Sequence, residues 1–365
     1  MSASLYDPFQ RRCGIASPGR MNVSSALAHC HGGMGWGCYR RLSILLYYPN
    51  MAIVMEESEP LARHTVFKIG GPARFFVPAK SGADIAAAVQ LARERGAPWV
   101  MLGAGSNLLV SDQGFPGVII HPVAGRIRVA GAELIADAGA PMARAVAEAS
   151  RAGLTGFEWA IGVPGTIGGS VFGNAGCFGS EMKDVVSSIA VFNALTGATE
   201  TWPGSAARFD YRSSVFKRRP ELVVLSATIA LRPGDPVAGQ RLIREHTARR
   251  ARTQDIGTQS AGCIFKNIPW ARRDVNPERL LERYPELIPF RQNPAIPAGF
   301  LIDQVGLKGR AIGRVKVSER HGNFFLNTGG AVAEEVVMLI GLAKERVHRR
   351  YGLLLEEEIR YVGFE

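Results

Sequence analysis

The stretch Ile161-Gly-Val-Pro-Gly-Thr-Ile-Gly-Gly-Ser170, followed by Gly173-Asn-Ala-Gly176, decides the fold of this chain. Seven glycines fall between positions 162 and 179, and a backbone so rich in glycine either packs against another backbone or wraps a ligand. A shorter loop, Gly103-Ala-Gly-Ser-Asn107, directly follows an apolar strand predicted at residues 99–102. Together the two loops predict a pyrophosphate site, because anion cradles need backbone N–H groups more than side chains.

The residues expected to bind this phosphorylated ligand all lie in the two loops. They are Gly103, Ala104, Gly105, Ser106, Asn107, Gly162, Pro164, Gly165, Gly168, Gly169, Ser170, Asn174 and Gly176. The first loop is not a Rossmann fingerprint, because GxGxxG is absent and no helix clearly begins there. Taken alone, it is as compatible with a tight turn at a strand exit as with a binding function.

Composition and charge narrow the classes of function. Of the 365 residues, 47% are hydrophobic and 21% are charged, which is an ordinary globular balance. The net charge is +11, of which residues 1–54 carry +4, and the remaining +7 would suit anionic ligands such as nucleotides. Nucleic-acid binding is disfavoured, because no basic run is interleaved with aromatic residues. The five cysteines form no CxxC pair, so no metal site is predicted, and the count fits a reducing compartment.

The first 54 residues do not read as a folded domain. They hold few acidic residues and no sustained periodicity, and we expect a disordered extension or a segment upstream of the true start, with Met51 and Met55 as candidate starts. The alternative is an export signal, since a mostly apolar run, 42–55, follows Arg40-Arg41. Pro49 and Asn50 interrupt that run, which is also too short to span a membrane.

The remaining chain predicts an α+β fold with short elements. Strands are expected at 75–78, 99–102, 117–121, 133–137, 189–194, 223–231, 323–327 and 353–362, and helices at 83–95, 141–151, 242–252, from 298 and at 332–351. Pro233–Pro236 marks a boundary, so the predicted domains are 58–232 and 233–365. The Pro- and Arg-rich residues 270–297 are predicted to be a surface insertion, either a lid or an ordinary surface loop.

Three further segments contain reactive side chains. Arg212 lies in Tyr211-Arg-Ser-Ser214, where a surface salt bridge would be its usual fate. Cys263 lies in Ser260-Ala-Gly-Cys-Ile-Phe-Lys-Asn267, as either a buried structural thiol or a thiol presented on a turn. In Leu355-Glu-Glu-Glu-Ile-Arg360, a strand would place Glu356 and Glu358 on one face.

Read in order, these segments resemble one family, MurB, the UDP-N-acetylenolpyruvoylglucosamine reductases of peptidoglycan precursor synthesis. The resemblance covers about residues 60–363 and rests on eight ordered motifs. They are Thr65-Val-Phe-Lys-Ile-Gly-Gly71, Leu102-Gly-Ala-Gly-Ser-Asn-Leu108, Gly162-Val-Pro-Gly-Thr-Ile-Gly-Gly169, Asn174-Ala-Gly176, Tyr211-Arg-Ser-Ser214, Ala261-Gly-Cys-Ile-Phe-Lys-Asn267, Gly306-Leu-Lys-Gly309 and Glu358-Ile-Arg360.

The resemblance implies an FAD-binding domain of the vanillyl-alcohol-oxidase (PCMH) type, followed by an α+β substrate-binding domain. It further implies a cytoplasmic enzyme that takes hydride from NADPH onto FAD. Hydride then passes from the reduced flavin N5 to the vinyl carbon of UDP-N-acetylglucosamine enolpyruvate. No nucleic acid or membrane partner is expected, and the oligomeric state stays open. A different oxidase of the same flavin fold is the alternative, but it should lack the 261–267 turn and Glu358.

By resemblance, Arg212 pairs with the enolpyruvyl carboxylate, Glu358 lies on the other side of that carboxylate, and Cys263 is the proton donor where the family often has Ser. Tyr211, Lys266 and Asn267 are the implied substrate-binding residues. The fifty residues between Arg212 and Cys263 resemble the type II branch, whereas the 270–297 insertion is longer than type II suggests. His64 stands where Asn is common, and residues 1–54 have no counterpart.

Overall fold

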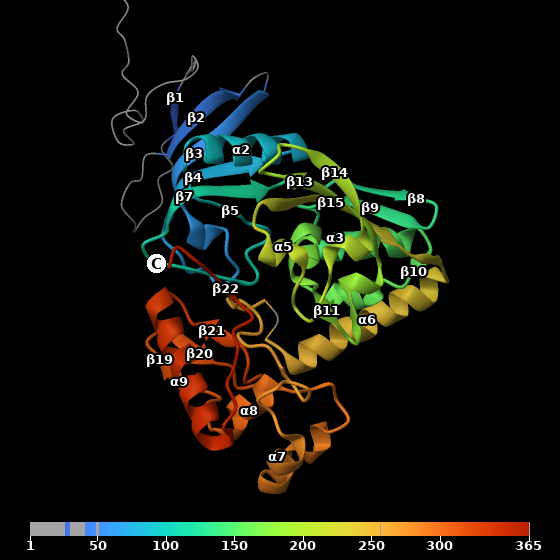
Figure 1. The fold of residues 1–365 in the computed structure, drawn as a ribbon, viewed down its shortest axis with the longest axis vertical. Coiled ribbons are helices and arrows are strands. Elements are labelled where there is room, and N and C mark those ends of the chain that lie inside the picture. The colour runs from blue at the N-terminus through green and yellow to red at the C-terminus, as the bar shows by residue number, and fades with distance from the viewer. Residues whose placement is uncertain (1–25, 30–40, 49–50, 256, 365) are drawn as a thin grey trace, which may run out of the picture.

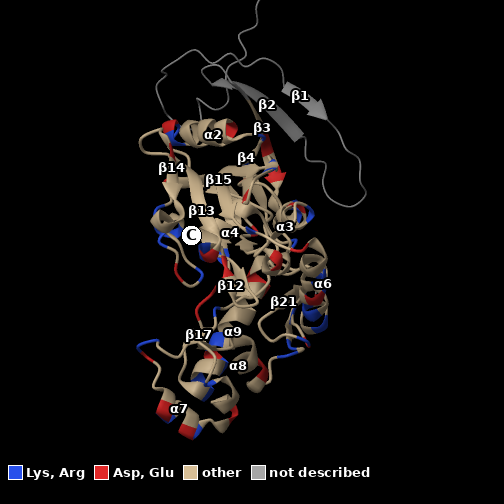
Figure 2. Ribbon diagram, turned by 90° about the vertical axis from the view of Figure 1, so that its right-hand side faces the viewer, with Lys and Arg blue, Asp and Glu red and all other residues tan. Residues whose placement is uncertain are grey.

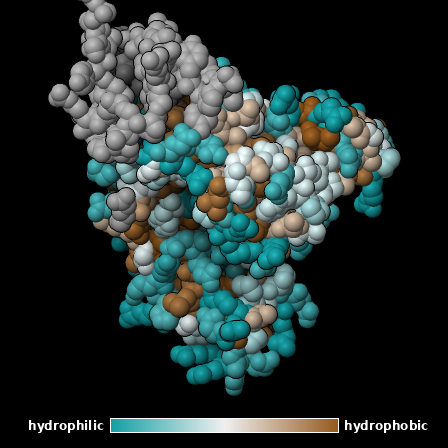
Figure 3. All heavy atoms as spheres, turned by 45° about the horizontal axis from the view of Figure 1, so that its top comes forward, coloured by the Kyte–Doolittle hydropathy of each residue, from teal (hydrophilic) through white to brown (hydrophobic). Residues whose placement is uncertain are grey.

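The computed structural model describes residues 26–29, 41–48, 51–255 and 257–364, which form a larger and a smaller lobe (Figure 1). The larger lobe contains two sheets, and the smaller lobe contains most of the last hundred residues. Hydrophilic side chains cover most of the smaller lobe in the space-filling view (Figure 3). Among the described helices, none is long and apolar enough to cross a bilayer.

The first sheet has six strands in the order β1-β2-β3-β4-β7-β5, antiparallel from β1 to β4 and parallel from β4 to β5. Helix α2 (Gly82–Glu94) covers it and begins where predicted, because the Ser81 side chain accepts a hydrogen bond from the N–H of Asp84. The strands are β1 (Ala26–His29), β2 (Arg41–Tyr48), β3 (Met51–Pro60), β4 (Pro72–Ala79), β5 (Trp99–Met101) and β7 (Phe115–Pro122).

The second sheet is antiparallel, with five strands in the order β14-β13-β15-β9-β8. Its Phe192 and Val223 join the apolar core beneath α2, so this helix lies between the two sheets. Helices α3 (Met142–Arg151) and α4 (Ile167–Gly173) pack against the sheet's other core residues. The strands are β8 (Ile127–Ala130), β9 (Glu133–Asp137), β13 (Val186–Asn193), β14 (Thr199–Pro203) and β15 (Leu222–Ala230).

The smaller lobe is built on the long helix α9 (Ala333–Tyr351), whose buried face packs on a three-stranded sheet, β19-β20-β21. Its other elements are α7 (Pro277–Arg283), α8 (Ala298–Gln304), β17 (Ile268–Pro269), β18 (Ala295–Ile296), β19 (Ala311–Ile312), β20 (Val315–Val317) and β21 (Phe325–Asn327). Short elements of the larger lobe are β10 (Leu154–Thr155), β11 (Gly176–Cys177), β12 (Ser180–Glu181), α5 (Val215–Arg218) and β16 (Arg232–Pro233).

The last strand joins the two lobes. β22 (Arg360–Val362) runs parallel to β6 (Leu108–Val110), which directly follows the first glycine loop. Phe67, Ile69 and Leu109 of the larger lobe are buried in the core of the smaller one. The predicted closing strand at 353–362 is therefore shorter than expected, and it places the carboxyl end of the chain against the glycine loop.

The expectation that residues 1–54 lack a fold is wrong for the part that the structure describes. β2 and β3 pair antiparallel, and β3 continues the first sheet through β4. Ile53 is 2% exposed and belongs to the core beneath α2. The expectation for residues 1–25, 30–40 and 49–50 lies outside the described residues. The strands escaped prediction because their pairing, rather than an alternating pattern, stabilises them.

Two other local expectations need correction. The stretch 162–176, predicted to be a loop, contains helix α4, which is capped by Thr166 at its start and by Asn174, in the left-handed conformation (φ 45°), at its end. The segment 270–297 is not a surface insertion, because its Leu280, Leu281 and Leu287 are buried in the core of the smaller lobe. The sequence did not predict this burial, because the apolar residues are scattered among prolines and arginines.

Helix α6 (Pro236–Thr253) contains the helix predicted at 242–252. It follows the predicted domain boundary at residue 233, so its contacts show to which lobe it belongs. It packs mainly on the short helix η2 (Glu158–Gly162) and on α3, both in the larger lobe. Gly239 is buried in this contact, where a Cβ would make only an ordinary van der Waals contact, 3.4 Å from Oε1 of Glu158. Helix α6 therefore belongs to the larger lobe, which extends past the predicted boundary at residue 233.

We predict that Leu287→Ala lowers the free energy of unfolding by about 3 kcal/mol, because it empties a fully buried site. The neighbouring Ile288, 56% exposed, offers a matched control. Ile288→Ala should change stability by less than about 0.5 kcal/mol. Urea unfolding of both variants measures the difference. If both variants lose equally little stability, Leu287 is not a core residue and the segment 270–297 is a surface loop.

Candidate active site

A cavity of about 990 Å³ lies between the two glycine loops and the smaller lobe. Both loops line it, together with three side chains expected to be reactive, Arg212, Cys263 and Glu358. The loops also touch each other, since the Ser106 hydroxyl donates to the carbonyl of Pro164 at 3.2 Å. The structure thus brings together segments far apart in the chain, such as Asn107 and Glu358, which are 251 residues apart and hydrogen-bonded.

The loop Gly103–Asn107 is suited to hold phosphate. Among the described residues, none accepts a hydrogen bond from the backbone N–H groups of residues 103–107, although those residues line the cavity. Gly105 has φ +62°, and a Cβ there would lie 2.1 Å from the carbonyl oxygen of His64. A Cβ at Gly103 would lie 2.9 Å from Thr166 Oγ1. A row of free donors that side chains cannot cover forms an anion nest.

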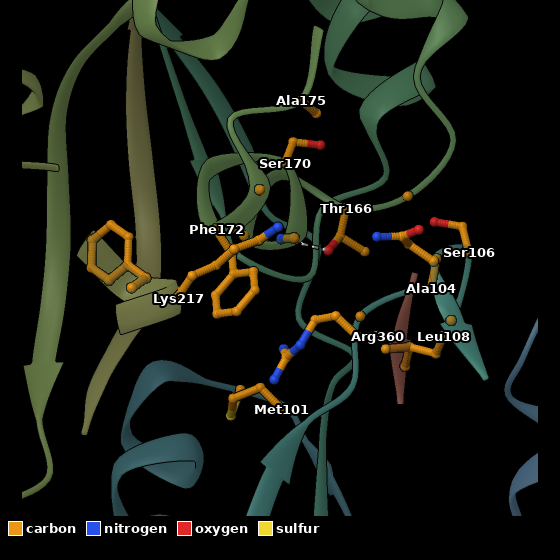
Figure 4. Close-up of a pocket in the computed structure, with 18 of the residues that line it drawn as sticks. Met101, Ala104, Ser106, Leu108, Thr166, Ser170, Phe172, Ala175, Lys217 and Arg360 are labelled. Atoms are coloured by element: carbon orange, nitrogen blue, oxygen red, sulfur yellow. Dashed lines mark hydrogen bonds between the residues drawn. The ribbon is translucent and has the colours of Figure 1, made fainter. Parts of the chain in front are cut away.

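The second loop supplies a helix with a bare face. Thr166 caps α4 by accepting from the N–H of Gly169 at 3.4 Å, as Figure 4 shows. Gly169 and Gly173 lie four residues apart and both line the cavity. A Cβ at Gly173 would meet nothing within 4 Å, so this face offers room for a ligand and not for packing. Gly168 serves packing instead, since its Cβ would lie 2.7 Å from that of Ala138.

Two cations project beside one aromatic ring of this cavity (Figure 4). The guanidinium carbon of Arg360 lies 4.5 Å from the ring centroid of Phe172, and Lys217 Nζ lies 5.9 Å from it. No carboxylate among the described residues forms an ion pair with either cation. Burial lowers the pKa of Lys217, because the charged amine loses hydration. Their charges favour an anionic or electron-rich ligand.

Arg212 occupies a strained turn. Its φ is +51°, and the turn is closed by two hydrogen bonds of 3.0 Å between the backbones of Asp210 and Ser213. Left-handed backbone costs a non-glycine residue about 1 kcal/mol or more, and such strain gathers at functional sites. Arg212 Nε lies 2.7 Å from Oε1 of Glu358, and one Nη donates to the carbonyl of Gly176. The pair is held by charge rather than alignment, since Nε has no well-aligned acceptor.

Glu358 is fixed by its backbone. Its N–H donates to the carbonyl of Ile264 at 2.7 Å, and Asn107 Nδ2 donates to the carbonyl of Glu358 at 3.1 Å. Burial raises the pKa of the Glu358 carboxyl, and the opposing charge of Arg212 only partly offsets this. A carboxyl of this kind takes up a proton more readily than a solvated glutamate.

Cys263 lies on the turn that the sequence singled out. The adjacent backbone is held on both sides, by a bridge between Cys263 and Phe324 and another between Phe265 and Glu357. The buried amide of Asn323 donates to the carbonyl of Phe265 and accepts from its N–H. The half-buried thiol faces the cavity, and burial, reinforced by Glu358, raises the pKa of Cys263 to about 12. The thiol therefore stays protonated at neutral pH.

Four expected site residues lie outside the cavity lining. Asn174 is fully buried, and its side chain bonds to Glu181, Asp210 and the N–H of Lys183. Tyr211 accepts from the N–H of Asn267 at 3.3 Å, whereas the Asn267 side chain accepts from Ala298. Lys266 pairs with Glu356 at 3.2 Å. Tyr211, Lys266 and Asn267 form one cluster beside Arg212, and Asn174 has a structural role.

Sequence inspection missed several cavity residues, namely Thr166, Phe172, Cys177, Lys217, Arg250 and Arg360. One signal was available for Arg360, which shares a strand face with Glu358 two residues away. The basic stretch 244–252, which includes Arg250, predicted a solvated helix face, with electrostatic steering of a UDP-sugar or NADPH as the alternative, and did not single out Arg250 as a cavity residue. Among the described residues, no group of three or more His, Cys, Asp or Glu side chains is arranged to hold a metal ion.

The fold and the cavity define a flavin-dependent oxidoreductase. Residues 73–201 match a model for an FAD binding domain, and residues 253–362 match the C-terminal domain of UDP-N-acetylenolpyruvoylglucosamine reductase. The chain belongs to the UDP-N-acetylenolpyruvoylglucosamine reductase (MurB) family. The predicted fold class, with the flavin domain first, is confirmed.

Relatives support this membership over most of the chain. The reductase of Synechococcus sp. (strain JA-3-3Ab) is 38% identical over 307 residues, which is 83% of this chain and 90% of the relative. That of Heliobacterium modesticaldum is 37% identical over 84% of this chain and 90% of the relative. The crystal structure of MurB from Thermus caldophilus superimposes with a TM-score of 0.66 at 29% identity, over 85% of this chain and 98% of that one.

We predict that Gly105→Ala weakens FAD binding by about tenfold or more, because the new methyl would push the loop off the backbone at His64. Gly131 is a matched control, with φ +59° and nothing within 4 Å of a Cβ. Gly131→Ala bears the same backbone strain but should keep its flavin. The flavin-to-protein absorbance ratio after purification compares them. Full flavin content in Gly105→Ala would contradict a cradle at this loop.

The raised pKa of Cys263 predicts slow alkylation. Since about three pH units separate a pKa of about 12 from the ordinary value of 9, the thiolate fraction at pH 8 falls roughly a thousandfold. Iodoacetamide labelling of the Cys263 peptide, followed by mass spectrometry, should be far slower in native protein than in urea. Equal labelling rates in the two states would mean that the thiol is not held in its protonated form.

Proposed function

We propose that this enzyme uses NADPH and FAD to reduce UDP-N-acetylglucosamine enolpyruvate to UDP-N-acetylmuramate, a step of peptidoglycan precursor synthesis. One observation supports this above the others: Arg212, Glu358 and Cys263, from three distant segments, line the cavity that the glycine loops form. A cation, a carboxyl and a protonated thiol are the groups that reduction of an enolpyruvyl ether requires. The names of the relatives state the same acceptor.

The chain's residues fit FAD. The free N–H groups of residues 103–107 would hold the pyrophosphate, and the bare face of α4 at Gly169 and Gly173 leaves room beside it. Arg360 and Lys217 would place positive charge beside the ring system. When bound, the flavin accepts hydride from NADPH and supplies it to the vinyl carbon of the acceptor. Every other part of the reaction depends on the polypeptide.

Arg212 and Glu358 would bind and polarise the enolpyruvyl carboxylate. Hydride addition at the vinyl carbon drives negative charge onto that carboxylate, and a preorganised guanidinium stabilises this charge most in the transition state. The substrate carboxylate would share Arg212 with Glu358. Two ionised carboxylates repel, so the raised pKa of Glu358 favours binding by allowing it to take up a proton.

Cys263 would protonate the carbon that bears the carboxylate. Its thiol faces the cavity on a turn held to both Phe324 and Glu357, so its position is fixed before substrate arrives. A general acid must carry its proton at the working pH, and the raised pKa of Cys263 ensures this. After transfer, the thiolate would lie near the charges of Arg212 and Arg250, which lower the thiol's pKa.

We predict that Cys263→Ala separates the two half-reactions. NADPH should bleach the flavin at nearly the wild-type rate, whereas reoxidation by the enolpyruvyl substrate should slow by about 100-fold or more, as expected when a general acid is removed. Cys263→Ser should retain much of the activity, because a hydroxyl can donate a proton from the same position. Stopped-flow flavin absorbance measures both steps. Intact reoxidation in Cys263→Ala would remove Cys263 from the mechanism.

A further inference from the structure

Arg250 is a cation of the cavity to which the proposed mechanism assigns no contact with the substrate. It lies near the end of α6, in the stretch 202–252 that neither family model covers. Basic residues are frequent along this helix (Figure 2). Most point to solvent, whereas Arg250 is half-buried and lines the cavity. Within the described residues, no carboxylate forms an ion pair with it.

The side chain of Arg250 is positioned in advance. Its Nε donates to Gln254 Oε1 at 2.8 Å, which leaves the two Nη groups without a carboxylate partner. Its stem packs at Gly162, where a Cβ would lie 3.3 Å from Arg250 Cδ and 2.9 Å from Cys177 Sγ. Phe178, which follows Cys177 in the hairpin of β11 and β12, stacks on His246 of α6 with ring centroids 4.0 Å apart. These contacts fix the guanidinium group of Arg250 relative to the second glycine loop.

Arg250 shares the cavity with the three groups of the proposed mechanism, Arg212, Glu358 and Cys263. The charges of Arg212, Glu358 and Arg250 all act on the thiol of Cys263. A substrate whose carboxylate is held by the Arg212–Glu358 pair, with its reacting carbon at Cys263, can extend its remaining atoms along the same cavity to Arg250.

We propose that Arg250 binds the diphosphate of the UDP-sugar substrate. This rests on the proposed function and adds a residue to it. A guanidinium fork matches two phosphate oxygens, and a desolvated cation without a carboxylate partner gains most from a dianion. The flavin's pyrophosphate is a poorer match, because the nest at residues 103–107 already supplies its donors. Arg250 would thus set the distance between carboxylate and diphosphate that an acceptor must span.

The test uses holoenzyme with Arg250→Met, which keeps the stem and removes the charge. Exposed Arg252 on the same helix provides the matched control Arg252→Met. Calorimetry measures the binding of UDP and of uridine, and stopped-flow absorbance gives the apparent Kd of the enolpyruvyl substrate. We expect Arg250→Met to weaken UDP and substrate binding by about tenfold to a hundredfold, and uridine binding hardly at all. Arg250→Lys should recover part of the loss, and Arg252→Met should behave as wild type.

Three results would overturn the assignment. Unchanged UDP binding in Arg250→Met would exclude a phosphate contact, and an equal loss for uridine would mean a general disturbance of the site. A loss confined to NADPH binding or to FAD content would move Arg250 to the cosubstrate or the cofactor. If the UDP-sugar fails to reoxidise the wild-type flavin, the proposed function fails first. Normal wild-type turnover with an unaffected Arg250→Met variant refutes the inference alone.

Discussion

The contact between Asn107 and the returning C-terminal strand is the constraint on which the site depends. The N–H of Arg360 donates to the carbonyl of Asn107 at 3.0 Å, and the Asn107 side chain donates to the carbonyl of Glu358 at 3.1 Å. The same five-residue loop presents its free N–H groups to the cavity. The nest that suits the cofactor's phosphates and the carboxyl expected to act on the substrate are therefore held in register by one short strand pair, β6 with β22.

Burial sets the chemistry of the groups so assembled. The walls of the cavity remove water from Glu358 and Cys263, and the pKa of each is raised because the anionic form is penalised. Lys217 and Arg360 lose hydration in the same cavity, which lowers the pKa of each. Neutral acids beside poorly hydrated cations describe a site prepared for a ligand that brings its own negative charge. A salt-bridged surface would offer no such preference.

Much of the fold and of the candidate site could be predicted from the sequence, and the elements that could not be predicted share one cause. Local sequence predicts three features: the glycine loops, the turn at Cys263 and the capped helix after Ser81. Each contains residue types that its backbone conformation requires. Helix α4 was not predicted, because the glycines that leave one of its faces bare are also typical of a loop. The sequence did not reveal the burial of Leu280 and Leu287, which stand among prolines and arginines, and β2 and β3 show no alternating pattern although they pair with each other and β3 pairs with β4. Pairing and packing decide such elements more than the local pattern of residue types.

The proposed proton donor, Cys263, illustrates how the fold changes an argument drawn from residue type. As an ordinary thiol, Cys263 would be an acid whose proton is partly lost above neutrality. Within the cavity its pKa of about 12 keeps the proton in place, but also makes transfer less favourable. Arg212 and Arg250 reduce that cost, since their charges favour the thiolate that transfer would leave. When Glu358 is protonated, the carboxylate charge that opposes the thiolate disappears as well. The acidity of the proposed donor is thus set by its burial first and by its three charged neighbours second, more than by its sulfur.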